Sequence, residues 1–122
     1  MAGARFQTDI TPIAAMPEAE TVHVRGRVTL DEAGQAREAL LDAVDRHDGS
    51  KIVLELAGIE EIDTSGAAVL AEALKLGLTR GKRVLLCSPS ESVMRIFRLA
   101  GFEDVLEHCC FDAQETWRRL QD

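Results

Sequence analysis

The chain has few aromatic residues, no long hydrophobic run and no signal-like start, and each absence excludes a class of protein. Aromatic side chains make up 4% of the 122 residues, so the core must be built mainly from aliphatic side chains. No run approaches the roughly 18 apolar residues of a membrane-spanning helix, and residues 1–9 lack the apolar centre of a secretory signal. We therefore expect a soluble protein that is not exported, which in a bacterium means a cytoplasmic one.

Basic charge is also scarce. Lys and Arg together number 14 against 21 Asp and Glu, which gives a formal net charge of −7. Binding to a phosphate backbone or to anionic lipid requires a concentrated basic surface. We therefore expect neither nucleic-acid binding nor direct insertion into a membrane, and a protein partner with a basic surface fits the charge better.

The sequence indicates neither a disulfide framework nor a metal site. Cys87 lies within an apolar run, and Cys109 and Cys110 are adjacent, a spacing that suits neither an ordinary disulfide nor a zinc pair. The three histidines are scattered, each beside a different expected element. Gly58 and Gly66 do not make a phosphate-cradling loop. We expect reduced, structural cysteines, no metal ion and no cofactor.

Hydrophobic periodicity divides the chain into alternating strands and helices. Strands are expected at residues 6–13, 21–25, 51–56, 83–88 and 105–110, and helices at about 31–47, 64–79, 89–100 and 113–120. This order predicts an α/β sandwich, in which about four helices cover a mixed, mostly parallel sheet of about five strands that opens with an antiparallel hairpin. Without a repeat or a linker, residues 1–122 are expected to form a single domain with its core at about 6–120.

Capping residues mark several boundaries. Thr29 or Asp31 is expected to cap the first long helix, and Gly49 is expected to end it in the left-handed conformation. Ser88, followed by a proline and then a glutamate, is expected to be the N-cap of the third helix. Gly101 is expected to end that helix in a Schellman-type stop.

The stretch most indicative of function is Ile59-Glu-Glu-Ile-Asp-Thr-Ser-Gly66, which joins a buried strand to a helix. Asp63 can act as the helix N-cap, because its carboxylate can accept the first free N–H groups. Thr64 and Ser65 then place two hydroxyls in the first turn, and Gly66 leaves no side chain to obstruct an approaching molecule. A capped turn without any chemistry would use the same residues. The rest of the chain must therefore decide between a functional hydroxyl site and a purely structural turn.

Four features in the correct order make the whole chain resemble a STAS domain, and within that family the single-domain bacterial anti-sigma factor antagonists. They are the Gly26-Arg-Val loop after the second strand, the buried strand leading into Asp63-Thr-Ser-Gly66, the strand and turn Arg83-Val-Leu-Leu-Cys-Ser-Pro89, and the helix Val93-Met-Arg-Ile-Phe-Arg-Leu-Ala-Gly-Phe102. The Asp-Thr-Ser-Gly tetrapeptide alone is weakly specific. The four features together cover about residues 6 to 120.

The resemblance implies a phosphorylation switch. In this family the serine before the glycine, here Ser65, is phosphorylated by a partner anti-sigma factor that is itself a serine kinase. The unphosphorylated form binds that factor so that its sigma factor is released, and a phosphoserine phosphatase resets the cycle. The partner-binding residues that the resemblance implies are Gly26, Arg27, Val28, Thr29, Asp63, Thr64, Ser65, Gly66, Ala67 and Ala68. The first loop departs from the family pattern, because Thr29 stands where an acidic residue is common and Asp31 follows two positions later.

Physical chemistry also favours Ser65 as the switch. A phosphoryl group adds about −1.5 to −2 charge and three acceptor oxygens. A helix N-terminus tolerates this charge, whereas a partner surface shaped for a neutral hydroxyl beside Glu60, Glu61 and Asp63 would reject it. Thr64 is the alternative acceptor, and we expect it to be the more crowded of the two because it is β-branched and first in the helix.

Two other roles stay open at this point. The same fold also occurs as a small cytoplasmic subunit docked on the ATPase of a lipid ABC transporter, where the hydroxyl pair would pack in a constitutive interface. It occurs as well as a stressosome-type scaffold, which requires large assemblies. An enzyme is the least favoured class, because a nucleophilic serine needs a general base and no histidine lies near the motif in the sequence.

Overall fold

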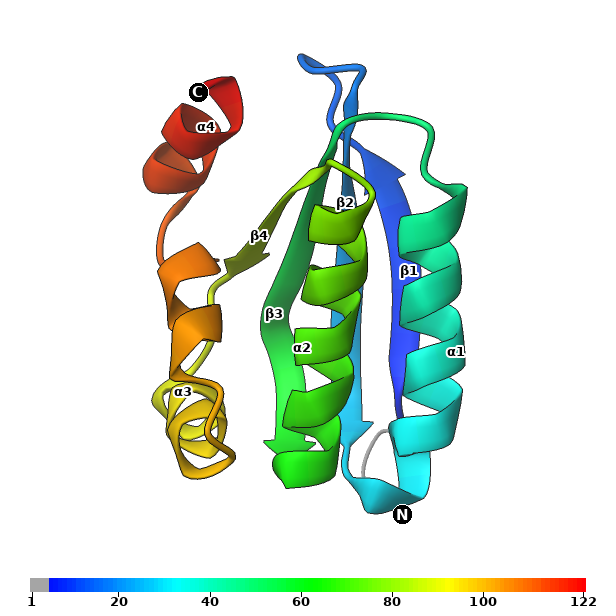
Figure 1. Cartoon of the computed structure of the whole chain (residues 1–122), viewed down its shortest axis with the longest axis vertical. Helices are drawn as coiled ribbons and strands as arrows, with labels where there is room; N and C mark the ends of the chain where they lie inside the picture. The colour runs from blue at the N-terminus through cyan, green and yellow to red at the C-terminus, as the bar shows by residue number, and fades with distance from the viewer. Residues whose placement is uncertain (1–4) are drawn as a thin grey trace.

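The computed structural model describes residues 5–122 as a five-stranded sheet with helices on both faces (Figure 1). The sheet order is β1-β2-β3-β4-β5; β1 runs antiparallel to β2, and the other neighbours are parallel. The strands are β1 Gln7–Pro12, β2 Ala19–Val28, β3 Lys51–Ile62, β4 Arg83–Cys87 and β5 Cys109–Cys110. The helices are α1 Leu30–Arg46, α2 Thr64–Thr79, α3 Glu91–Leu99 and α4 Ala113–Gln121, together with the 3-10 helix η1 at Glu103–His108. The predicted α/β sandwich, with its opening hairpin, is confirmed.

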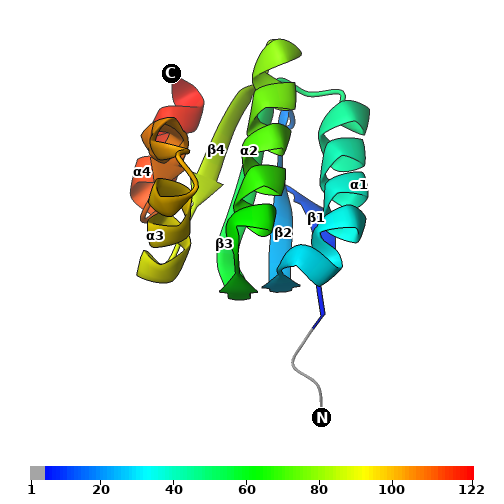
Figure 2. The same cartoon turned by 60° about the horizontal axis from the view of Figure 1, so that its bottom comes forward.

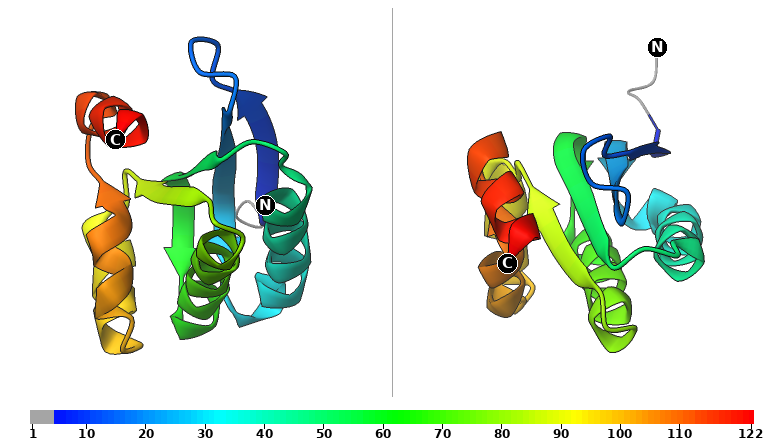
Figure 3. Two further views of the ribbon diagram at one scale, coloured as in Figure 1. Left: turned by 45° about the horizontal axis from the view of Figure 1, so that its top comes forward. Right: turned by 90° about the horizontal axis from the view of Figure 1, so that it is seen from above.

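Helices α1, α2 and α3 cover one face of the sheet, and α4 covers part of the other (Figures 2 and 3). The main core cluster lies under the three helices and includes Leu40, Leu54 and Leu70, all with 0% exposure. A smaller cluster on the opposite face contains Val53 and Leu120. Because consecutive residues of a strand point to opposite faces, β3 contributes to both clusters and is buried on both sides. Its apolar run predicted this arrangement.

Strands β2 and β3 are longer than their apolar patterns indicate. The loop expected at residues 26–29 is wrong, because Gly26 pairs with Ile59 and Val28 pairs with Ile62. The register shifts after Gly26, whose φ is 82°. A left-handed glycine at a bulge lets a strand bend and continue, so both strands run on to the starts of α1 and α2.

Two of the predicted capping residues are wrong. Ser90, and not Ser88, is the N-cap of α3, and its hydroxyl accepts the N–H of Val93 at 3.2 Å. Ser88 has a φ of 58° and turns the chain after β4. Gly49 is not in the left-handed region; a Cβ there would lie 2.1 Å from the carbonyl oxygen of Glu18. Close approach of two backbone segments, and not a helix stop, therefore requires glycine at position 49.

The end of α3 agrees with the prediction. Gly101 has a φ of 82°, and the N–H of Phe102 donates to the carbonyl oxygen of Phe97 at 2.8 Å. These are the features of a Schellman stop. The chain then enters η1.

The last strand is much shorter than the one expected at residues 105–110. The first part of that range belongs to η1, and only Cys109 and Cys110 pair with β4, opposite Leu86 and Cys87. Within residues 5–122, the first half of β4 therefore has no strand on its outer side.

The three cysteines are buried and free, as expected of structural residues. Burial raises the pKa of the Cys87 thiol to about 12 and that of Cys109 to about 11, so both stay protonated at neutral pH. In the part of the chain that the structure describes, no three His, Cys, Asp or Glu side chains are placed to hold a metal ion. None of the helices described combines the length and apolar character needed to cross a bilayer.

Candidate functional site

Strands β2 and β3 end side by side at one end of the sheet, and α1 and α2 begin there (Figure 2). β2 leads into α1 through Thr29, and β3 leads into α2 through Asp63. Two segments that are far apart in the sequence therefore meet at one end of the sheet. This end carries all the residues that the resemblance implies for partner binding.

Asp63 holds the two helix starts together. One carboxylate oxygen accepts the N–H of Gly66 at 3.0 Å, and the other accepts the N–H of Leu30 at 2.9 Å. The first bond caps α2, as predicted, and the second satisfies a free N–H at the start of α1. Because each oxygen binds a different helix, the hydroxyl motif and the first loop are fixed relative to each other.

Thr29 caps α1, which decides between the two expected capping residues. Its hydroxyl and N–H both donate to one carboxylate oxygen of Glu32, at 2.6 and 3.0 Å. These hydrogen bonds lower the pKa of the Glu32 carboxyl below its ordinary value. Arg27 forms ion pairs with Glu32 at 3.8 Å and with Glu61 at 3.3 Å. Thr29 is only 7% exposed, so this departure from the family pattern serves the helix start and does not face a partner.

Gly66 is buried against the end of β2, which corrects its expected role. A Cβ at this position would lie 1.9 Å from the carbonyl oxygen of Val28. Only glycine lets α2 approach the strand this closely. Gly66 therefore positions the hydroxyl pair by close packing inside the fold, and it does not leave space for an approaching molecule.

Thr64 and Ser65 occupy the first turn of α2, where Thr64 is exposed and Ser65 is half-buried. The expectation that Thr64 is the more crowded residue is therefore wrong. Helical side chains point back over the preceding turn, and the first residue of a helix has no preceding turn to cover it. Both residues therefore contribute to the surface of the molecule.

Half of the predicted contact residues lie inside the fold. The accessible ones, half-buried or exposed, are Arg27, Asp63, Thr64, Ser65 and Ala68. The buried ones are Gly26, Val28, Thr29, Gly66 and Ala67. The strand pairing of β2 and the packing of α2 on its end remove the second group from the surface. These residues shape the site from inside the fold.

Sequence reasoning missed one residue of this end of the sheet, Leu30. Its side chain is 71% exposed, and its N–H is the one that Asp63 binds. The signal was available, because Leu30 lies off the buried stripe of α1 that contains Ala36 and Leu40. An exposed leucine at the same end of the sheet as the two hydroxyls can supply an apolar contact.

The site is acidic. The segments that meet at this end of the sheet carry five exposed or half-buried carboxylates, those of Asp31, Glu32, Glu60, Glu61 and Asp63. Arg27 is the basic side chain among them, and its guanidinium is already engaged by Glu32 and Glu61. A negative charge added at Ser65 would therefore meet further negative charge.

Similarity to known proteins covers most of the chain. A family model described as "Mlab, STAS domain" matches residues 13–107. An anti-sigma factor antagonist from Mycobacterium paratuberculosis is similar with a TM-score of 0.75 and 15% identity, over 96% of this chain and 95% of that one. SpoIIAA, an anti-sigma factor antagonist solved in its unphosphorylated form, is similar with a TM-score of 0.68 and 17% identity, over 95% and 96% of the two chains. SpoIIAA of Bacillus has also been solved in the phosphorylated form.

Part of a much longer chain shares the fold as well. The structure of SLC26A9 is similar with a TM-score of 0.73 and 13% identity, over 85% of this chain but only 20% of that one. At sequence identities this low, the similarity to these solved structures shows that the fold is shared and shows nothing about function.

Proposed function

Because this chain belongs to the STAS domain family, we propose that it is an anti-sigma factor antagonist whose affinity for its partner is switched at Ser65. The observation that carries the proposal is the half-buried Ser65 in the first turn of α2, two residues after Asp63, whose carboxylate fixes both helix starts. The likeness in fold to SpoIIAA, solved with and without its phosphate, supports it.

In its unphosphorylated form the chain binds an anti-sigma factor that is also a serine kinase, and the sigma factor is released. The kinase then transfers the terminal phosphoryl group of ATP to Ser65. The bond from the serine oxygen to phosphorus forms as the bond from phosphorus to the ADP oxygen breaks, and the hydroxyl proton passes to a base of the kinase. A phosphoserine phosphatase hydrolyses the ester and restores the hydroxyl.

The phosphate acts locally on binding and leaves the fold intact. The free N–H groups of the first turn of α2 accommodate negative charge. The nearby carboxylates repel that charge, and a partner surface shaped for a neutral hydroxyl cannot accommodate it. A loss of about 100-fold in affinity requires only about 3 kcal/mol, which one desolvated and unpaired charge can supply.

The surface offered to the partner combines apolar and polar groups. We define the switch surface as Arg27, Leu30, Thr64, Ser65 and Ala68, all of which are exposed or half-buried. Leu30 supplies the largest apolar side chain, and the carboxylates around it favour a basic partner. This composition suits a contact that must form and release, because the hydroxyl in its centre becomes charged.

Catalysis by Ser65 itself is not part of the proposal. Asp63 is the acidic side chain next to it in the sequence, but both of its oxygens accept backbone N–H groups. A carboxylate engaged in this way holds the backbone and is not placed to take the serine proton.

Mass spectrometry after incubation with the cognate kinase, ATP and Mg²⁺ tests the proposal. We expect a single phosphate on Ser65 in the wild-type chain and in Thr64→Val, and none in Ser65→Ala. Modification of Ser65→Ala but not of Thr64→Val would assign the switch to Thr64. Absence of phosphate in all three chains, with a kinase active on another substrate, would overturn the switch.

A constitutive subunit of a lipid ABC transporter is the second candidate. The observation that favours it is the 71% exposed Leu30 beside the hydroxyl pair, which also suits a permanent interface. Ser65→Ala would then weaken assembly without any phosphate. Affinity purification with wild-type and Ser65→Ala baits separates the two, because a transporter ATPase without a sigma regulator among the bound proteins would decide for the subunit. Recovery only in very large assemblies would indicate the scaffold role.

A further inference from the structure

A groove of about 330 Å³ lies between α4 and the face of the sheet opposite α1, α2 and α3. We call it the α4 groove, and its lining includes Val53, Glu55, Cys87, Asp112, Trp117 and Leu120. The floor is apolar, because Val53, Cys87 and Leu120 are all buried. A concave site with an apolar floor and a few polar groups is typical of small-ligand sites, and this volume lies at the lower end of their range.

The α4 groove contains a tryptophan that the fold leaves partly uncovered. Ala113, Thr116 and Leu120 all line the groove, and Trp117 lies on the same side of α4 at helical spacing. Tryptophan is highly buried on average, whereas Trp117 is 40% exposed. The groove therefore offers a bound molecule a flat aromatic surface, and the face of an indole ring also attracts cations.

The charged lining of the α4 groove is acidic. Glu55 and Asp112 both line it, and neither forms an ion pair with any residue in the range 5–122. One oxygen of each carboxylate accepts a backbone N–H, that of Ala57 at 2.8 Å and that of Glu115 at 2.7 Å. The second oxygen of each is left for a ligand. Among the described residues that line the groove there is no Lys or Arg.

Glu55 stands beside the floor of the groove. In the sheet register it is opposite Cys87 of β4 and His23 of β2, so these three side chains share one face. Burial is the main cause that raises the pKa of the Cys87 thiol to about 12, and the nearby Glu55 carboxylate contributes to the increase. The Nε2 of His23 already shares a hydrogen bond with the Thr11 hydroxyl at 3.2 Å. The Glu55 carboxylate thus lies next to an apolar surface without a paired cation.

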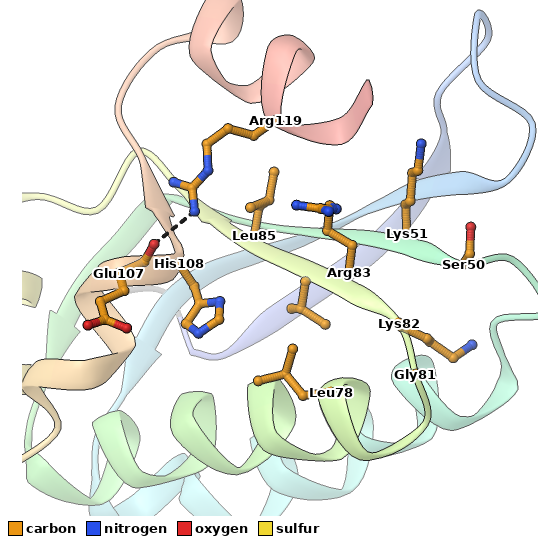
Figure 4. Close-up of a pocket in the computed structure, with 11 residues that line it drawn as sticks. Ser50, Lys51, Leu78, Gly81, Lys82, Arg83, Leu85, Glu107, His108 and Arg119 are labelled. Carbon is orange, nitrogen blue, oxygen red and sulfur yellow. Dashed lines mark hydrogen bonds between the residues drawn. The ribbon is translucent and has the colours of Figure 1, made fainter. Parts of the chain in front are cut away.

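A second groove, of about 590 Å³, lies where β3 and β4 begin and has a different charge (Figure 4). Its basic lining residues are Lys51, Lys82, Arg83 and Arg119. Glu107 lines it as well, and Figure 4 shows its backbone carbonyl accepting a hydrogen bond from Arg119, at 2.8 Å. Lys51 pairs with Glu18 at 3.6 Å. Basic side chains still outnumber acidic ones there, so an organic cation should prefer the α4 groove.

We propose that the α4 groove binds a small organic cation, namely a protonated amine that carries a short apolar group. The carboxylates of Glu55 and Asp112 attract the ammonium group, and the apolar group packs against the indole of Trp117 and the buried floor. The same lining disfavours an anion of similar size, because it has no lysine or arginine to pair with the negative charge.

Titration followed by tryptophan fluorescence tests this site, because Trp117 is the only tryptophan in the chain. The probe is phenethylamine, and its controls of similar size are the neutral phenethyl alcohol and the anionic hydrocinnamate. We expect a saturable change in emission with the amine, at least about tenfold weaker binding of the alcohol, and no binding of the anion. The proposal is overturned if the amine gives no saturable change at about 10 mM, a concentration that mostly fills a millimolar site.

Variants that remove charge but keep the local hydrogen bonds complete the test. Glu55→Gln keeps an oxygen for the Ala57 N–H, and Asp112→Asn keeps an oxygen that caps α4. Each should weaken amine binding about fivefold, as expected of a partly exposed charge pair. Glu38→Gln, at an exposed carboxylate of α1, should leave it unchanged.

Three further outcomes would overturn the proposal. They are equal affinity for the amine and the alcohol, saturable binding of hydrocinnamate, and amine affinity that is unaltered in both Glu55→Gln and Asp112→Asn. None of these readouts involves Ser65, so the α4 groove and the switch stand or fall separately.

Discussion

The two ends of the sheet differ in charge and in how completely their backbone is closed. Where β2 and β3 end, Asp63 ties both helix starts and the surroundings are acidic. Where β3 and β4 begin, Lys82, Arg83 and Arg119 lack carboxylate partners among residues 5–122, and half of β4 is unpaired on its outer side. A closed end can present a hydroxyl whose charge changes without moving the fold. At the other end, Val84 and Leu85 have no strand on their outer side within the described residues, yet each is only 1% exposed.

The largest expected effect on stability lies at the closed end, in Gly66→Ala. Its Cβ would stand 1.9 Å from the carbonyl oxygen of Val28, so α2 must shift away from the strand. We expect a loss of about 3 kcal/mol in the free energy of unfolding, as for other overpacked sites, measured by urea denaturation.

Gly34→Ala is the matched control for that substitution. Gly34 lies in α1, and a Cβ there meets nothing within 4 Å. Alanine should stabilise this helix by about 0.5 to 1 kcal/mol, since glycine is the poorer helix former. If both glycine variants changed stability alike, close packing at Gly66 could not be the reason for its glycine.

Asp63→Ala is expected to have the next largest effect. It removes the acceptor of two backbone N–H groups at once, with an expected cost of about 2 kcal/mol. Asp63→Asn, which can still accept one of these N–H groups, should cost about half as much.

At the opposite end of the sheet, Arg83→Ala should change stability by less than about 0.5 kcal/mol. Equal losses at Asp63 and Arg83, measured by thermal or urea unfolding, would remove the contrast between the two ends.

Affinity for the anti-sigma partner should fall by a smaller amount in Leu30→Ser. Loss of one apolar anchor from the switch surface is expected to weaken binding about tenfold, or about 1.4 kcal/mol. Leu99 on α3 is exposed to the same extent, 71%, and lies outside this surface. Calorimetry should show wild-type affinity for Leu99→Ser. Equal weakening by both serine variants would place the contact elsewhere.

The smallest effect concerns acid stability through Glu32. Its pKa is lowered in the folded chain, by the Thr29 hydroxyl first, from an ordinary value of 4.5. The carboxylate therefore stabilises the fold above that pH, and the contribution is lost as the pH falls through the lower, folded-state pKa. The stability difference between wild type and Glu32→Gln should shrink on going from pH 7 to acid. Glu38→Gln, at an exposed position of the same helix, should show no such trend.

Periodicity was sufficient to predict the elements that bury an apolar face. The spacing of Val69, Leu70 and Ala73 predicted the inner side of α2, and all three are buried. Asp63 was also predictable as a cap from its neighbours in the sequence, because a carboxylate just before a helix accepts the free N–H groups of the first turn. These features depend only on residues near each other in the chain.

What could not be predicted depends on partners that are distant in the sequence. Gly26 suggested a loop, but pairing with β3 carries β2 through it as a bulge. Gly66 suggested an open approach, but the end of β2 fills that space. β5 was overestimated because the residues before Cys109 pack as η1 rather than beside β4. Leu30 could have been noticed as an apolar residue off the buried stripe of its helix.

The most direct test of the switch is the affinity of the cognate anti-sigma factor for the chain before and after phosphorylation, with the phosphate located by mass spectrometry. We predict that phosphate on Ser65 weakens binding at least about 100-fold and that Ser65→Asp also weakens binding. Ser50→Asp, at the opposite end of the sheet, should leave the affinity unchanged. Equal affinity of the phosphorylated and unphosphorylated chains would contradict the switch.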